Sequence, residues 1–194
     1  MELKTVYFEK PGGEENTAKT LALALKRADA LGIKTFVVAT TTGATAVKAV
    51  DALKGYKVIV VTHTAGFREP NGQEFTGENR KIVESKGGTI VTAAHALGGI
   101  QRALSSAGTG GPPAPSQAIG DVAAMTLRMF SQGTKVACEI AAMAADAGLV
   151  RADEEIISIG GTGRGADTAL VLKPDYTHRF FGLRVKEIIC KPRL

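Results

Sequence analysis

Residues 34–46 read Lys-Thr-Phe-Val-Val-Ala-Thr-Thr-Thr-Gly-Ala-Thr-Ala, and this stretch decides the fold. The apolar run over residues 36–39 is continuous rather than alternating, which predicts a strand covered on both faces. Thr42 and Gly43 then begin a helix that is expected to continue to Leu53. A buried strand that leads directly into a helix is typical of a parallel sheet with helical crossovers.

The same alternation extends outward from this stretch in both directions. Strands are predicted over residues 5–8, 34–39, 57–61, 89–92, 156–159, 168–172 and 185–190, and helices over residues 17–31, 44–53, 78–85, 116–130 and 135–147. The helix at 116–130 follows an irregular glycine- and proline-rich stretch and takes Ser116 as its N-cap. The two strands within 156–172 are expected to be antiparallel. The sequence therefore predicts a three-layer, doubly wound α/β fold, with a mostly parallel sheet and late antiparallel strands, in a single domain over residues 1–194.

Composition excludes several classes of protein. The 194 residues are 44% hydrophobic and 22% charged and hold only two cysteines, which is typical of a globular protein rather than a disulfide scaffold. No apolar run reaches the length of a membrane span, and residues 1–5 lack the pattern of a signal peptide. We therefore expect a cytoplasmic protein with no membrane partner. Met125, Met129 and Met143 are expected to fill the core.

Charge is concentrated at the C-terminal end. Residues 173–194 contain six Lys or Arg and two acids, which leaves a net charge of +4 there out of +5 for the whole chain. A basic end is compatible with an anionic partner, but a solvated, slightly basic edge is the simpler interpretation. Because this segment has few interleaved aromatic residues, we do not expect nucleic-acid binding.

Glycines, hydroxyls and imidazoles gather in the loops that follow the predicted strands. In an open parallel sheet these loops share one edge, where ligands bind. The candidate ligand-binding residues at this edge are Thr40, Thr41, Thr42, Gly43, Ala44, Thr45, Thr62, His63, Gly66, Phe67, Gly161, Thr162, Gly163, Arg164 and Asp167.

The threonine-rich loop at residues 40–45 is the sharpest signal. Free N–H groups at a helix N-terminus attract anions, and threonine hydroxyls add donors without a competing negative charge. The loop is therefore a candidate phosphate cradle. The alternative is a threonine N-cap that only starts a helix.

The glycine-rich loop at residues 160–167 does not match the dinucleotide pattern. The G-x-G-x-x-G spacing is absent from it, and a strand rather than a helix is predicted next. Arg164, flanked by glycines, is a candidate fork donor to a phosphate or carboxylate, the alternative being a solvated arginine. We expect this loop to close over the ligand, with Arg164 or Asp167 in contact with it.

The three histidines and two cysteines do not predict a metal site, because their spacing fits no ligand motif. His63 and His95 fall on the predicted ligand edge, where either is a candidate hydrogen-bonding or acid–base group. An enzyme class does not follow from these residues, and a homo-oligomer stays open.

Two segments resemble a known family. Residues 36–46, with the threonine loop, resemble the strand–loop–helix of the C-terminal domain of pyruvate kinase, in which a T-x-S-G-x-[ST]-A segment holds the phosphate of an allosteric sugar bisphosphate. Residues 160–169 resemble that domain's late glycine loop, although its tryptophan and asparagine are missing here. The catalytic barrel domain has no counterpart in 194 residues, so the resemblance does not imply kinase activity.

Stand-alone proteins of this type form a family that is labelled pyruvate kinase α/β-domain-like. Similarity to them implies flavin mononucleotide (FMN) as the phosphorylated ligand. Two classes of function follow from the resemblance: a binding or regulatory module for this ligand, and a flavin-dependent oxidoreductase that uses the same pocket with His63 or His95 as proton donor.

Overall fold

The computed structural model describes residues 4–102 and 118–194. Its strands are β1 (Val6–Phe8), β2 (Thr35–Ala39), β3 (Lys57–Val61), β4 (Thr89–Val91), β5 (Ile156–Gly160), β6 (Thr168–Lys173) and β7 (Arg184–Pro192). Its helices are α1 (Glu14–Leu31), α2 (Ala44–Ala52), α3 (Gly77–Ser85), α4 (Gly99–Arg102), α5 (Ile119–Arg128), α6 (Gln132–Asp146) and the 3₁₀ helix η2 (Thr177–Gly182). The predicted N-cap Ser116 lies outside the described residues.

The seven strands form one sheet in the order β1-β7-β6-β5-β2-β3-β4. β6 is antiparallel to both of its neighbours, whereas the other neighbouring strands pair in parallel. The predicted, mostly parallel sheet with late antiparallel strands is confirmed. The carboxyl ends of β2, β3, β4 and β5 consequently meet at one edge, where the loops that follow these strands lie close together.

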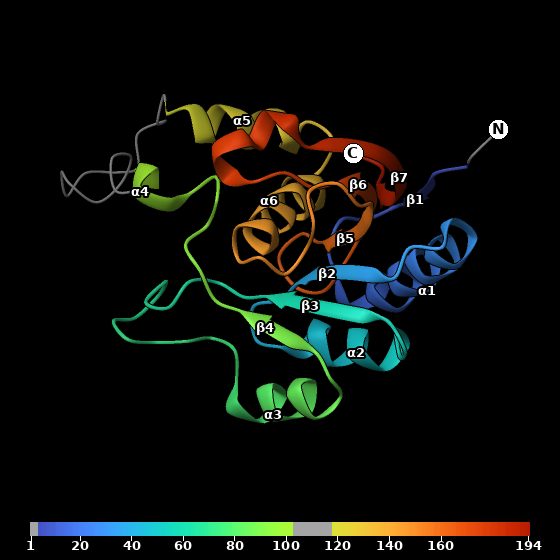
Figure 1. Ribbon diagram of the computed structural model, residues 1–194, viewed down its shortest axis with the longest axis horizontal. Coiled ribbons are helices and arrows are strands. Elements are labelled where there is room, and N and C mark those ends of the chain that lie inside the picture. The colour runs from blue at the N-terminus through green and yellow to red at the C-terminus, as the bar shows by residue number, and fades with distance from the viewer. Residues whose placement is uncertain (1–3, 103–117) are drawn as a thin grey trace.

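Helices cover both faces of the sheet, as the continuous apolar run of β2 predicts (Figure 1). Phe36 and Val38 belong to the core beneath α1, α2 and α3, whereas Val37 belongs to the core beneath α6. All three side chains are fully buried. The fold is therefore the three-layer α/β arrangement expected from the sequence.

Two helices begin three residues before their predicted starts. α6 begins at Gln132 rather than at Lys135, because the Ser131 hydroxyl caps it by accepting a hydrogen bond from the backbone N–H of Thr134 at 2.9 Å. α1 begins at Glu14 rather than at Thr17, after Gly13. Neither α4 nor η2 was predicted, because short helical turns leave no periodic pattern to detect.

The prediction that all three methionines fill the core is wrong for two of them. Met143 is buried, but Met125 is 51% exposed and Met129 is 80% exposed. The reason lies in how α5 packs: its small residues Ala123 and Ala124 face the protein, whereas most of its large apolar side chains, Met125 among them, are exposed.

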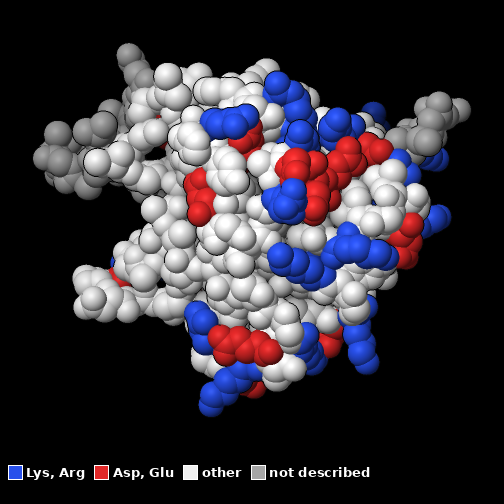
Figure 2. All heavy atoms as spheres, in the orientation of Figure 1, with Lys and Arg blue, Asp and Glu red and all other residues white. Residues whose placement is uncertain are grey.

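The basic C-terminal segment is built into the sheet. β7 lies between β1 and β6, and the guanidinium of Arg27 on α1 pairs with the Glu187 carboxylate of β7 at 2.6 Å. Figure 2 shows basic and acidic side chains intermingled over one face of the molecule. The face drawn there thus carries both signs of charge side by side.

Candidate functional site

A cleft of about 770 Å³ opens where the loops after β2, β3 and β5 meet. Its size falls within the range of small-molecule sites. Eleven of the predicted site residues line it: Thr40, Thr41, Thr42, Ala44, Thr45, Thr62, His63, Phe67, Gly161, Gly163 and Arg164. Gly43, Gly66, Thr162 and Asp167 are not among its lining residues. The structure therefore brings the loops of three strands into one site, as the fold class implies.

The threonine loop presents the N-terminus of α2 to this cleft. Gly43 is the N-cap residue, no side chain caps the helix, and no acidic residue stands in the first turn. The Gly43 backbone adopts a left-handed φ of 99°. An ideal Cβ on Gly43 would lie 2.2 Å from the Phe75 ring, so glycine is required here for space as well as for conformation.

Hydrogen bonds from neighbouring segments fix the shape of this loop. The Thr40 hydroxyl accepts a hydrogen bond from the Gly43 N–H at 3.1 Å. The Thr42 carbonyl accepts one from the Thr76 N–H at 3.2 Å and one from Asn79 Nδ2 at 2.9 Å. The helix N-terminus is thus held open toward the cleft by residues on the far side of the loop.

His63 is held in place by a carboxylate at the mouth of the cleft. His63 Nδ1 lies 2.7 Å from Glu74 Oε2, and Arg68 Nε donates to Glu74 Oε1 at 2.8 Å. Burial acts to raise the pKa of the Glu74 carboxyl, but the hydrogen bonds from His63 and Arg68 outweigh it and hold that pKa below its ordinary value. Glu74 is therefore ionised near neutral pH.

This lowered pKa predicts a pH dependence of stability. A carboxyl with a lower pKa in the folded state adds stability above its unfolded pKa of about 4.3, and that stability is lost as the pH falls through the folded-state pKa. The free energy of unfolding should therefore fall more steeply between pH 6 and pH 3 in the parent protein than in Glu74→Gln. Urea unfolding across this range measures it. Glu69→Gln changes an exposed acid in the same loop and should behave like the parent; a Glu74→Gln profile parallel to the parent's would contradict the assignment.

The glycine loop after β5 divides into an exposed tip and an anchored end. Gly163 and Arg164 are exposed and line the cleft. Gly165 pairs with Gly13, and an ideal Cβ on Gly165 would lie 2.2 Å from the Gly13 backbone. The backbone of this loop is therefore in direct contact with the start of α1.

Asp167 points into the protein rather than into the cleft. Its side chain is fully buried, with Oδ2 accepting from the Gly12 N–H at 3.0 Å and Oδ1 from the Thr168 hydroxyl at 2.7 Å. The Thr168 hydroxyl in turn lies 3.2 Å from that of Ser131, the cap of α6. Through these contacts the Asp167 side chain links the loop between β1 and α1 to β6 and to the start of α6.

A buried ion pair on α6 was missed by sequence reasoning. The Lys135 ammonium pairs with the Glu139 carboxylate, and these side chains, 11% and 6% exposed, both line the cleft. Glu139 Oε1 also accepts a hydrogen bond from the Leu97 N–H at 3.0 Å. The spacing of four residues in an alanine-rich helix was the available signal, but such pairs are usually solvated.

The cleft is rich in cations from several elements. Besides Arg164 and Lys135, three basic residues that were not predicted line it: Lys48 of α2, Arg68 of the loop after β3, and Arg128 of α5. Arg128 Nε donates to Gln132 Oε1 at 2.8 Å, which joins the end of α5 to the start of α6. Because Arg68 and Lys135 pair with the carboxylates of Glu74 and Glu139, which line the same cleft, the positive charge offered to an anionic ligand comes from Lys48, Arg128 and Arg164.

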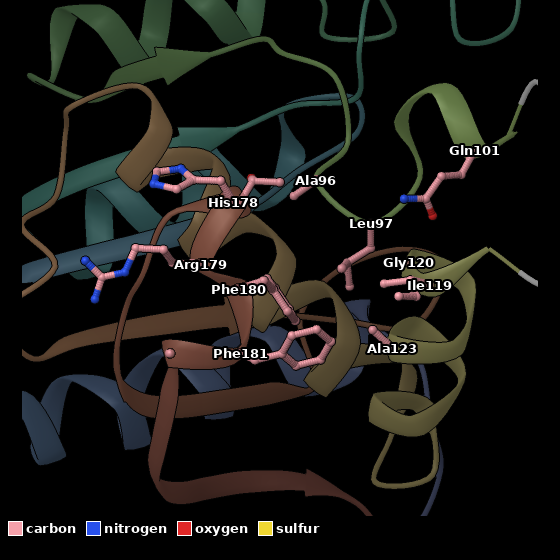
Figure 3. A pocket seen from close by; sticks show the side chains of 12 residues that line it. Ala96, Leu97, Gln101, Ile119, Gly120, Ala123, His178, Arg179, Phe180 and Phe181 are labelled. Atoms are coloured by element: carbon pink, nitrogen blue, oxygen red, sulfur yellow. The ribbon is translucent and has the colours of Figure 1, made fainter.

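A second cavity of about 430 Å³ lies among α4, α5 and η2. Figure 3 shows Leu97, Ile119 and Phe181 around it. It contains neither the threonine loop nor the glycine loop, so it is separate from the predicted site.

Both cysteines are free and buried. Burial raises the pKa of the Cys138 thiol to about 12 and that of the Cys190 thiol to about 11, which keeps both protonated at neutral pH. Over residues 4–102 and 118–194, no group of three or more His, Cys, Asp or Glu side chains is placed to hold a metal ion. The helices in these ranges are all too short or too polar to cross a membrane.

Comparison with known protein families agrees with this architecture. Residues 18–172 match the family described as pyruvate kinase, alpha/beta domain. Among solved structures, Cryptosporidium parvum pyruvate kinase in complex with ADP is similar, with 15% sequence identity and a TM-score of 0.41 over 84% of this chain. The chain spans 24% of the length of that protein. On the match of the family model over most of its length, the chain belongs to the pyruvate kinase alpha/beta domain family.

Proposed function

We propose that the chain binds a phosphorylated small molecule in the cleft, with FMN as the first candidate. The observation that carries the proposal is the uncapped N-terminus of α2, which has no acidic residue in its first turn and opens into a cleft lined by several cations. Such a helix end attracts phosphate through its free N–H groups. Lys48 and Arg164 line the same cleft and would add charge-assisted hydrogen bonds.

The other lining residues suit a ligand of the size and shape of FMN. A volume of about 770 Å³ accommodates a phosphate together with a planar ring system. Aromatic side chains stand at the His63 end, where the His63 and Phe67 ring centroids are 4.5 Å apart. In this arrangement the threonine loop would hold the phosphate, and the rings would flank the planar part of the ligand.

Binding of FMN is tested by titration against two reference compounds. The fluorescence of FMN should be quenched or shifted when the protein binds it. Riboflavin, which lacks the phosphate, should bind at least tenfold more weakly. Inorganic phosphate should compete with FMN. Equal affinity for FMN and riboflavin would show that the phosphate does not contribute to binding and would contradict the proposal.

Arg164 gives a mutational test of the same site. Arg164→Ala should raise the dissociation constant for FMN at least tenfold, because one charge-assisted hydrogen bond contributes ~1.5 to 3 kcal/mol. The salt dependence of binding should flatten as well. Arg151→Ala is the matched control, because Arg151 is exposed, pairs with Asp153 and does not line the cleft. If both variants bind FMN alike, Arg164 is only a solvated side chain.

The carboxylate-held His63 favours a second candidate function. An imidazole oriented by a carboxylate is a common general acid or base. A flavin-dependent oxidoreductase would use such a group beside the bound ring. Turnover of a reductant by the FMN-loaded protein, lost in His63→Gln, would distinguish this function from binding alone.

A further inference from the structure

Three aromatic rings form a cluster at one end of the cleft. The ring centroids of His63 and Phe67 are 4.5 Å apart, those of His63 and His95 5.4 Å, and those of Phe67 and His95 5.3 Å. All three residues line the cleft, as does the threonine loop. A ligand anchored by phosphate at α2 therefore has an aromatic surface within the same cavity, which suits a planar ring.

The hydrogen bonds around His63 determine which of its nitrogens carries a proton. Glu74 is ionised and accepts only, so the His63 nitrogen that faces it, Nδ1, must be the donor. In a neutral imidazole the other nitrogen is then an acceptor. Arg68 occupies the second oxygen of Glu74, which keeps the carboxylate in place. His63 consequently offers Nε2 as an acceptor.

The titratable and charged groups near His63 and along the cleft come from several elements. Glu74 and Arg68 belong to the loop that follows β3, and His95 belongs to the loop that follows β4. Lys135 and Glu139 of α6 line the same cleft but pair with one another. A ring edge that reaches His63 Nε2 therefore meets an acceptor whose orientation is set by Glu74.

We propose that His63 is a specificity-determining residue that selects phosphate monoesters of a ring bearing an imide N–H. Its Nε2 would accept a hydrogen bond from that N–H. Glu74 is the positioning residue that sets the tautomer. The inference rests on the proposed function, because it takes the phosphate end of the ligand to lie at α2. Flavins and uracil share this imide chemistry, since each carries an N–H between two carbonyl groups.

The decisive comparison is FMN against FMN methylated at the imide nitrogen. The parent protein should bind the methylated compound about tenfold more weakly, which corresponds to one hydrogen bond of about 1.4 kcal/mol. In His63→Phe, which keeps an aromatic ring but removes the nitrogens, methylation should change the affinity less than twofold. An equal loss in the parent and in His63→Phe overturns the proposal.

Glu74→Gln tests the assigned tautomer independently, because it should exchange the donor and acceptor roles of the two His63 nitrogens. Arg68 donates to the residue at position 74, so the glutamine oxygen should turn toward Arg68 and its NH₂ group toward His63. His63 Nε2 would then become a donor, and the preference for the imide N–H should disappear. Retention of the full tenfold preference in Glu74→Gln contradicts the assigned tautomer.

Two nucleotides distinguish the sources of the imide. UMP carries the imide N–H, whereas CMP has an acceptor nitrogen in its place. Displacement of FMN by UMP at concentrations tenfold lower than by CMP extends the site to pyrimidine nucleotides, and equal displacement by the two counts against selection by His63. FMN binding that depends on phosphate but not on His63 would overturn only this inference, whereas FMN and riboflavin binding alike would overturn the proposed function.

Discussion

Gly43→Ala is expected to lower the free energy of unfolding by about 3 to 5 kcal/mol, from strained backbone and overpacking together. The backbone of Gly43 has a φ of 99°, which alanine adopts only with strain. An ideal Cβ would also lie 2.2 Å from the Phe75 ring and 2.5 Å from Asn79 Cβ. Relief of these contacts must move Asn79, whose amide holds the Thr42 carbonyl. The threonine loop should therefore lose its shape, and affinity for FMN or phosphate should fall with stability.

Gly55→Ala is the control for Gly43→Ala, because it introduces backbone strain without a steric clash. Gly55 follows the other end of α2 with a φ of 91°, but an added Cβ meets nothing within 4 Å. This variant should therefore lose only about 1 kcal/mol, the cost of backbone strain alone. Urea unfolding of both variants, with phosphate competition as the second readout, measures the difference. Equal losses would show that the contact with Phe75 relaxes at little cost.

Most of the sheet could be predicted from local sequence, because each central strand carries its own signal. β2 and β3 are unbroken apolar runs, and strands covered on both faces require such runs. The start of α6 was placed three residues late because Ser131 caps it from within a turn, where polar residues carry no periodicity. The exposed Met125 and Met129 were misplaced for a related reason. Both faces of α5 are apolar, so periodicity does not show which of them is buried.

The sequence predicts best the site residues that follow the ends of strands. It predicts least well the side-chain pairs whose contact depends on packing. The threonine loop was found because β2 leads directly into α2. The pairing of His63 with Glu74 was not, because Glu74 lies in a long loop without a pattern. Lys135 and Glu139 are charges on a helix, and sequence alone does not distinguish a buried pair from a solvated one. Contacts of this kind are set by packing between elements.

Asp167→Ala is expected to lower the free energy of unfolding by about 2 to 6 kcal/mol, because one buried and one partly buried donor would lose their acceptor at ~1 to 3 kcal/mol each. The sequence placed Asp167 beside the ligand, since a glycine-rich loop does not reveal which of its side chains turns inward. In the structure its carboxylate instead receives the Gly12 N–H and the Thr168 hydroxyl. Asp167→Asn keeps one acceptor oxygen and should lose less, and Asp153→Ala, at an exposed carboxylate, should leave the free energy of unfolding close to that of the parent. Urea unfolding without ligand measures all three. If Asp167→Ala is as stable as the parent but binds FMN more weakly, Asp167 acts in ligand binding and the structural role assigned here is wrong.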